Sequence, residues 1–177
     1  MKVLVTGAAG FIGGQLWHKL WQRGDEVVGI DNFSYGNLDN LKFDDHDFGA
    51  EVQKMDIRDK AGMLQLFEEE KFEVVYNIAG IAPLPDCQSD PVQAIEVNTL
   101  GLVNLLEAGR RTGIRQLVQA STNAMYENET EFPTVESKFN PPTLIYPNTK
   151  YCGERFAQSF ADTYLSLIHI SEPTRRT

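Results

Sequence analysis

The sequence predicts an α/β fold, a doubly wound parallel sheet, in a single folded domain, and one observation supports each part of this prediction. Short apolar runs rich in β-branched residues alternate with longer stretches of helical periodicity, the pattern of parallel strands joined by crossover helices. The 177 residues are 42% hydrophobic and 23% charged, which is typical of one soluble globular domain. We therefore expect a single core built around one sheet.

The expected elements follow in chain order. Strands at 2–5 and 26–30 enclose a helix at 11–22 and form one βαβ unit. Further strands are expected at 52–55, 74–78 and 116–120, and further helices at 60–70, at 91–111 and from about Tyr146 onward. The stretch 32–49, rich in Asp, Asn and Gly, has no clear period and is expected to be a loop or a short irregular excursion.

Composition excludes several classes of function. The formal net charge of -9 argues against nucleic acid as a partner, because affinity for nucleic acid comes largely from Lys and Arg. Cys87 and Cys152 are too few for a disulfide framework and lack the spacing of a zinc site, so no metal is expected. No apolar run is long enough to span a membrane, and no signal peptide precedes the first strand. We therefore expect a cytoplasmic protein without a membrane partner.

The final stretch, 165–177, is expected not to be natural protein sequence. Its residues LSLIHISEPTR read as one translated frame of the transposase adapter used in sequencing libraries. His169 therefore receives no functional role. The domain assignment is 1–164 for the folded domain, expected to be incomplete at its C-terminus, and 165–177 for adapter read-through.

A glycine-rich turn joins the first strand to the first helix. Its sequence, TGAAGFIG at 6–13, places glycines where a tight turn, a close approach to a pyrophosphate and close packing of helix on sheet are needed. The start of the helix then offers free N–H groups and the positive end of its dipole to phosphates. The context after a strand and before a helix predicts a dinucleotide-binding, Rossmann-type unit. The residues assigned to this cradle are Gly7, Gly10, Phe11, Ile12 and Gly13.

An acidic residue ends the second strand. Asp31 follows the glycines by about 20 residues, where a carboxylate accepts hydrogen bonds from the adenosine ribose and repels a 2′-phosphate. The sequence therefore favours NAD over NADP as cofactor, with Asp31 and the adjacent Asn32 in its site. A strand-ending Asp that caps a turn is the structural alternative.

A phenol and an ammonium follow the fifth strand. Tyr146 and Lys150 are four residues apart, which places both on one face of a helix. Nearby positive charge favours the ionised form of a phenol, so this pair suits proton abstraction from a hydroxyl. The same spacing also occurs on ordinary helix surfaces, and its position after the fifth strand is the feature that favours the catalytic interpretation.

Together these features resemble the extended short-chain dehydrogenase/reductase family, the NAD-dependent epimerase/dehydratase group, from Met1 to about Tyr164. The resemblance extends to further segments after the strands: Asp56-Ile57, Asn77 to Gly80, Asp90-Pro91, Glu96 to Gly101 and Ser121 to Tyr126. It implies that NAD is the cofactor and a nucleotide sugar the substrate. It further implies a homodimer when the chain is full length, and a substrate subdomain that is largely missing here.

The resemblance assigns roles residue by residue. Asp56 and Ile57 flank the adenine, and Ala79 and Gly80 line the cofactor groove. Asn98 holds the geometry of the active-site helix. Thr122 stands where the family has its catalytic Ser or Thr, beside Tyr146. Tyr146 and Lys150 also belong to the cofactor site, where Lys150 binds the nicotinamide ribose.

The implied reaction is removal of a proton from a sugar hydroxyl by Tyr146 with hydride transfer to the nicotinamide, which gives a keto-sugar intermediate. Dehydratases of the family carry acidic residues directly after the catalytic Thr, whereas this chain has Asn123 and Ala124. The expected activity is therefore that of an isomerase, a sugar-nucleotide epimerase, and this fragment by itself is expected to be inactive. The alternatives are an NAD(P)-dependent reductase or dehydrogenase of another substrate and a non-catalytic nucleotide-binding protein.

Overall fold

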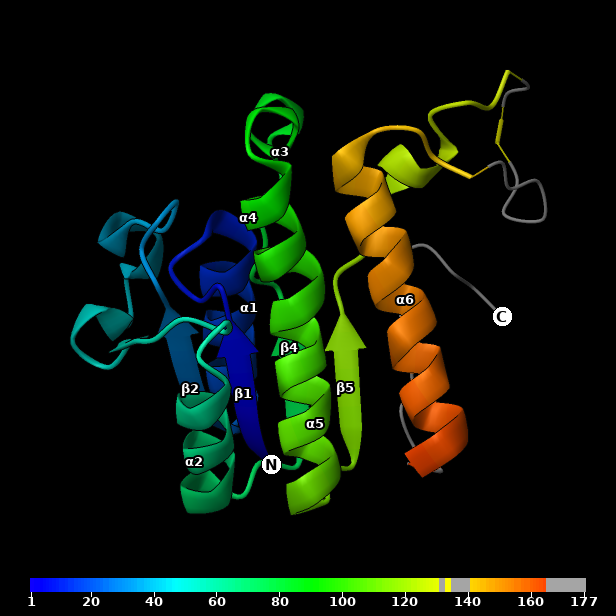
Figure 1. The fold of residues 1–177 in the computed structure, drawn as a ribbon. Coiled ribbons are helices and arrows are strands. Elements are labelled where there is room, and N and C mark those ends of the chain that lie inside the picture. The colour runs from blue at the N-terminus through cyan, green and yellow to red at the C-terminus, as the bar shows by residue number, and fades with distance from the viewer. Residues whose placement is uncertain (131–132, 135–140, 165–177) are drawn as a thin grey trace.

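The computed structural model of the chain describes residues 1–130, 133–134 and 141–164. Five parallel strands form one sheet in the order β3-β2-β1-β4-β5 (Figure 1). The strands are β1 (Lys2–Thr6), β2 (Glu26–Asp31), β3 (Gln53–Lys54), β4 (Val74–Asn77) and β5 (Gln116–Gln119). The chain turns from one side of β1 to the other between β3 and β4, which is the switch point where parallel α/β sheets open a ligand crevice. The predicted α/β doubly wound fold is confirmed.

Helices cover both faces of this sheet (Figure 1). They are α1 (Phe11–Gln22), α2 (Lys60–Glu70), α3 (Leu84–Ser89), α4 (Pro91–Ile95), α5 (Leu102–Thr112) and α6 (Ile145–Tyr164). Successive side chains of β1 alternate between two cores: Val3 and Val5 pack with Trp17 of α1, whereas Leu4 packs in the cluster that includes residues of α2 and α5. Because both faces of the sheet bury apolar side chains, helices must cover the sheet on both sides.

The helix predicted at 91–111 is one helical run with a widened middle. Between α4 and α5 the segment Glu96–Gly101 is π-helical, and the residues that flank it keep right-handed helical backbone angles. Helix α3 was not predicted, because six residues that begin after Pro83 are too few to show helical periodicity. The predicted adapter-derived stretch, 165–177, lies outside the described residues.

The excursion after β2 packs against α1 and the glycine-rich turn. Short 3₁₀ turns at Leu38–Leu41 and Phe48–Ala50 give it some regular structure. Its Phe48 stacks on Trp17, with ring centroids 4.9 Å apart. The backbone N–H of Asn37 donates to the carbonyl of Ala9 at 2.9 Å, which fixes the excursion beside the turn.

Candidate functional site

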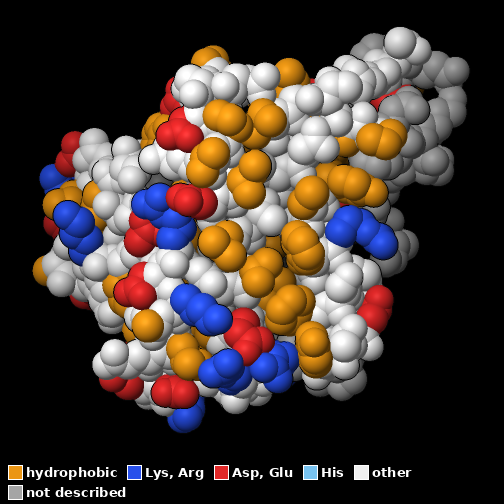
Figure 2. Space-filling model, in the orientation of Figure 1, with side chains coloured by type: hydrophobic (Ala, Val, Ile, Leu, Met, Phe, Trp, Pro, Cys, Tyr) orange, Lys and Arg blue, Asp and Glu red, His pale blue; other side chains and the backbone are white. Residues whose placement is uncertain are grey.

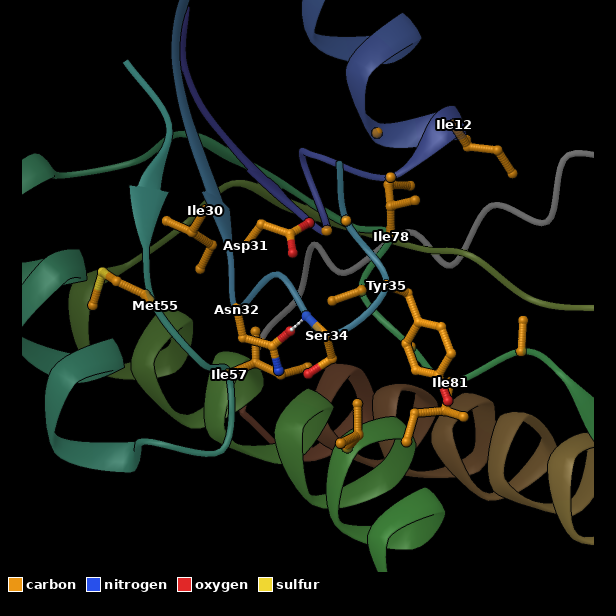
Figure 3. Close-up of a pocket in the computed structure, with 18 of the residues that line it drawn as sticks. Ile12, Ile30, Asp31, Asn32, Ser34, Tyr35, Met55, Ile57, Ile78 and Ile81 are labelled. Atoms are coloured by element: carbon orange, nitrogen blue, oxygen red, sulfur yellow. Dashed lines mark hydrogen bonds between the residues drawn. The ribbon is translucent and has the colours of Figure 1, made fainter. Parts of the chain in front are cut away.

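A groove opens at the carboxyl ends of β1, β2 and β4 (Figure 3). Its cavity of about 390 Å³ lies within the range of small-molecule sites. The predicted site residues that line it are Gly7, Gly10, Phe11, Ile12, Gly13, Asp31, Asn32, Ile57, Ala79 and Gly80. The predicted residues Asp56, Asn98, Thr122, Tyr146 and Lys150 lie outside this lining.

The glycine-rich turn leaves no room for side chains at two positions. Gly7 has a φ of 66°, and a Cβ there would lie 2.7 Å from the backbone nitrogen of Ala79. A Cβ on Gly13 would lie 2.0 Å from the carbonyl oxygen of Gly7. Glycine at both positions therefore lets the turn close and α1 approach the sheet.

The start of α1 is open to a ligand. Its N-cap is Gly10, which has no side chain to cap the first amides of the helix. Phe11 and Ile12 of the first turn are 75% and 65% exposed. Free amides and the helix dipole at this point can hold a pyrophosphate.

Asp31 is held rigidly at the end of β2. One carboxylate oxygen accepts from the backbone N–H of Ala9 at 2.9 Å, and the other accepts from the backbone N–H of Phe33 at 2.7 Å. The side chain is buried but borders the groove, and each oxygen can accept a second hydrogen bond. Asp31 can therefore accept the hydroxyl groups of a ribose.

Asp56 lies outside the groove wall but contacts two residues that line it. The Arg58 guanidinium beside it lowers the pKa of its carboxyl to about 2, through contacts of 2.8 and 3.1 Å. One of its oxygens also accepts from Asn32 Nδ2 at 2.9 Å. Arg58 itself lines the groove, and sequence reasoning missed it because nothing in the motif around Asp56 marks a cation.

Lys150 is buried on the sheet side of α6. Its Nζ donates to the carbonyl of Ala120 at 3.1 Å, directly after β5, and burial lowers its pKa to about 8. Tyr146, one helical turn earlier, is half-buried. Thr122 begins the next turn after Ala120, where its Oγ1 accepts from the backbone N–H of Ala124 at 3.1 Å. The predicted catalytic residues thus lie on α6 and in the segment that follows β5. The hydrogen bond from Lys150 to Ala120 joins these two elements.

The pKa of Lys150 predicts a gain in stability when the charge is removed. Its folded-state pKa of about 8 lies below the ordinary 10.5, so the folded protein binds this proton less tightly than the unfolded chain. The destabilisation is fully present below pH 8 and is relieved as the pH rises toward 10.5. Measured without cofactor, Lys150→Met should raise the free energy of unfolding at pH 7 by about 1–3 kcal/mol.

Urea unfolding at pH 7 and at pH 10 checks this prediction. The advantage of the Lys150→Met variant should shrink at the higher pH. If the variant is less stable than the parent protein at pH 7, this would contradict the inference that the buried charge of Lys150 destabilises the folded protein.

Asn98 links the groove to α6. Its side-chain amide accepts from the backbone N–H of Ile81 at 2.8 Å and donates to the carbonyl of the same residue at 2.9 Å. It also donates to Thr149 Oγ1, next to Lys150, at 3.0 Å. Asn98 is therefore in contact with both the groove-lining residue Ile81 and α6.

A buried chain of amides connects the glycine-rich turn to the acceptor of Lys150. Thr6 Oγ1 donates to Asn77 Oδ1 at 2.6 Å, and Asn77 Nδ2 donates to Gln119 Oε1 at 2.7 Å. Gln119 Nε2 then donates to the carbonyl of Ala120 at 2.8 Å. Sequence reasoning missed this network, because its side-chain pairs are 71 and 42 residues apart and become neighbours only through the strand order.

The start of α6 is tied to the segment that carries Thr122. Glu127 Oε1 accepts from the backbone N–H groups of Thr143 and Leu144 at 2.5 and 3.0 Å. Gln88 of α3 accepts from the backbone N–H of Ile145 at 3.0 Å. These contacts orient the helix that presents Tyr146.

The described part of the chain holds neither a metal-binding cluster nor a membrane span. Its His, Cys, Asp and Glu side chains do not form a group of three that could hold a metal ion. None of the described helices combines the length and the apolar character needed to cross a membrane.

Comparison with known proteins identifies similar chains. A model of the NAD dependent epimerase/dehydratase family matches residues 3–171. UDP-glucose 4-epimerase of Mycolicibacterium smegmatis is 35% identical over 173 residues, which cover 97% of this chain and 55% of that protein.

Solved structures of UDP-glucose 4-epimerases are also similar to this chain. A crystal structure of Thermus thermophilus UDP-glucose 4-epimerase in complex with NAD is 36% identical with a TM-score of 0.86, and the match covers 97% of this chain and 54% of that one. The Thermotoga maritima UDP-glucose 4-epimerase with UDP-glucose is 31% identical with a TM-score of 0.88, over 96% of this chain and 54% of that one. The chain thus spans about half the length of the relatives it matches.

Proposed function

The chain belongs to the NAD-dependent epimerase/dehydratase family, and from this premise we propose that it supplies the cofactor-binding part of a nucleotide-sugar epimerase. The observation that carries the proposal is the proximity of two features. A groove lies at the switch point of the sheet, and Lys150 Nζ would lie 3.2 Å from a Cβ at Gly80, which lines that groove. Lys150, with Tyr146 on the same helix, is hydrogen-bonded to Ala120 in the segment that leads to Thr122.

The groove fits NAD. Gly7 and Gly13 form a cradle that a Cβ would fill, and the uncapped start of α1 offers amides to the pyrophosphate. Asp31 is placed to accept the adenosine ribose hydroxyls, and Ile57 and Arg58 to border the adenine. At Gly80 the absence of a side chain leaves the groove open toward Lys150. A Cβ at this position would lie 3.2 Å from Lys150 Nζ.

Three residues of the chain have separate roles in the proposed reaction. Bound NAD supplies reversible acceptance of a hydride. Tyr146 takes the proton of the sugar hydroxyl as the carbon is oxidised, and Thr122 hydrogen-bonds that hydroxyl. Lys150 grips the nicotinamide ribose, and its positive charge favours the ionised phenol. The sugar becomes a ketone, turns within the site and is reduced on its other face.

The two residues after Thr122 favour epimerisation over dehydration. Elimination of water needs a second proton transfer, and Asn123 and Ala124 provide no carboxyl group for it. The probe we propose is UDP-glucose, the sugar nucleotide named for the similar enzymes, with formation of its C4 epimer followed by NMR. Conversion would support the proposal. Absence of conversion, together with reduction of a simple carbonyl compound, would favour the reductase alternative.

The activity is proposed for a longer protein than this chain. Residues 1–164 are proposed to form the NAD-binding domain, and the substrate site is proposed to need chain beyond them, because the relatives are about twice as long. Alone, the 177-residue chain should show no turnover of nucleotide sugars. Turnover by this chain alone would overturn that assignment.

A homodimer in the cytoplasm is likewise proposed for the full-length protein. Figure 2 shows hydrophobic side chains gathered over α4, α5 and α6. Val92 and Ile95 of α4 and Phe156 of α6 are 64%, 49% and 45% exposed. An exposed apolar surface of this kind supports an interface between copies.

The position of Asp31 predicts the choice of cofactor. Its carboxylate should accept the ribose hydroxyls of NAD and repel the 2′-phosphate of NADP, so the full-length protein should bind NAD more tightly, by about tenfold or more. Calorimetric titration with both cofactors measures the ratio. Asp31→Ser should reduce this preference, whereas a preference of the unaltered protein for NADP would refute the role of Asp31.

A further inference from the structure

The side chain of Tyr35 reaches from one wall of the groove to the other. Tyr35 belongs to the segment after β2, lines the groove and is 56% exposed (Figure 3). Its hydroxyl donates to Asp86 Oδ2 at 2.6 Å, and Asp86 lies on α3, in the segment that follows β4. The bond therefore joins segments 51 residues apart in the sequence.

This bridge passes over the carboxyl end of β1. In the sheet, β1 lies between β2 and β4, so a bond between the segments that follow β2 and β4 crosses above the end of β1. That end continues into the glycine-rich turn at Gly7. A dinucleotide bound as proposed above, from Asp31 toward Lys150, would pass close to this bridge.

Both ends of the bridge are anchored. On the β2 side, the N–H of Phe33 donates to Asp31, and the N–H of Asn37 donates to Ala9. On the other side, the Cys87 thiol donates to the carbonyl of Ile81 at 3.4 Å. Because the flanking backbone is fixed on each side, the hydrogen bond can open and close without rearrangement of either wall.

We propose that the Tyr35–Asp86 hydrogen bond is a clasp that closes over the bound dinucleotide and slows its release. This inference rests on the proposed NAD-binding function. A phenol bonded to a carboxylate makes a stronger hydrogen bond than a neutral pair, so its loss has a measurable effect on the rate of opening. Slow release suits an enzyme that takes a hydride from the substrate and returns it to the same molecule.

The clasp acts only on ligands that extend past it. NAD spans the groove from Asp31 to the Lys150 side and lies beneath the bridge. AMP occupies the Asp31 side alone. Loss of the bridge therefore accelerates release of the dinucleotide and leaves the affinity for AMP unchanged.

The experiment uses the full-length protein loaded with NADH and chased with excess NAD, with release followed by stopped-flow fluorescence. Tyr35→Phe removes only the hydroxyl of a largely exposed residue and should speed release about three- to tenfold. Asp86→Asn should have a similar effect, and the double variant should be no faster than the single ones. Tyr164→Phe, an exposed tyrosine at the end of α6, serves as the matched control and should release NADH at the parental rate.

The outcomes separate the clasp from the proposed function. Unchanged NADH release in Tyr35→Phe overturns the clasp, as does an equal loss of affinity for AMP, which would mean that Tyr35 only packs on the adenosine. Failure of the unaltered protein to bind either NAD or NADH overturns the proposed function and the clasp with it. Faster NADH release with unchanged AMP affinity supports the clasp.

Discussion

Replacement of Tyr146 by Phe should remove nearly all epimerase turnover of the full-length protein, by about 10²–10⁴-fold, while NAD affinity stays nearly unchanged. In the proposed reaction the phenol moves the substrate proton, whereas the main contacts proposed for the cofactor come from the glycine-rich turn, Asp31 and Lys150. The variant keeps the aromatic ring and so preserves packing at a half-buried position. Steady-state kinetics with UDP-glucose and calorimetry with NAD measure the two effects separately.

A control variant and two possible outcomes make this prediction specific. Tyr164→Phe removes a phenol from the same helix, far along it from Tyr146, and should retain parental turnover. Unchanged turnover in Tyr146→Phe would show that another group acts as the base. A parallel loss of NAD affinity would instead mean that Tyr146 contributes mainly to cofactor binding.

Substitution of Gly13 by Ala should weaken NAD binding strongly and destabilise the fold. The added Cβ would lie 2.0 Å from the backbone oxygen of Gly7, and neither atom belongs to a flexible side chain that can move aside. Displacement of α1 from the sheet should cost at least about 2–3 kcal/mol, because overpacking against backbone forces the elements apart. The same displacement moves the helix amides away from the pyrophosphate, so NAD affinity should fall roughly 30- to 150-fold.

Gly24→Ala is the matched control. Gly24 has a φ of 88°, but a Cβ there would meet nothing within 4 Å. This variant should lose about 1 kcal/mol of stability through backbone strain and keep its NAD affinity. Urea unfolding and calorimetry compare the two variants, and tight NAD binding by Gly13→Ala would contradict the cradle geometry.

Most helices and strands could be predicted from the sequence because each one contains its own apolar pattern and its own end signals. The helices at 11–22 and 60–70 have the predicted bounds, since apolar residues at helical spacing meet clear end signals there. Asp59 caps the second of them, and Lys71 ends it in a left-handed conformation. The π-helical segment 96–101 and the short helix α3 escaped prediction, because the first keeps an approximately helical period and the second is shorter than two turns.

The site was predictable where one motif contains all its parts. The glycines of the turn and Asp31 line the groove as expected, because strand, turn and helix are consecutive in the sequence. Asp56 lies outside the groove lining, whereas Arg58, which pairs with it, lines the groove. Contacts such as Asn77 with Gln119 and Tyr35 with Asp86 depend on strand order, so no local pattern announces them.

The most direct test of the proposed function follows the hydrogen at the carbon that is inverted. The full-length protein is incubated in ordinary water with UDP-glucose deuterated at C4, and the product is examined by NMR and mass spectrometry. In the proposed reaction the same hydrogen leaves as hydride and returns to the same sugar within a closed site, so the C4 epimer should form with its deuterium retained. Absence of the epimer, or an epimer whose deuterium has been replaced by hydrogen from water, would contradict the proposed epimerisation.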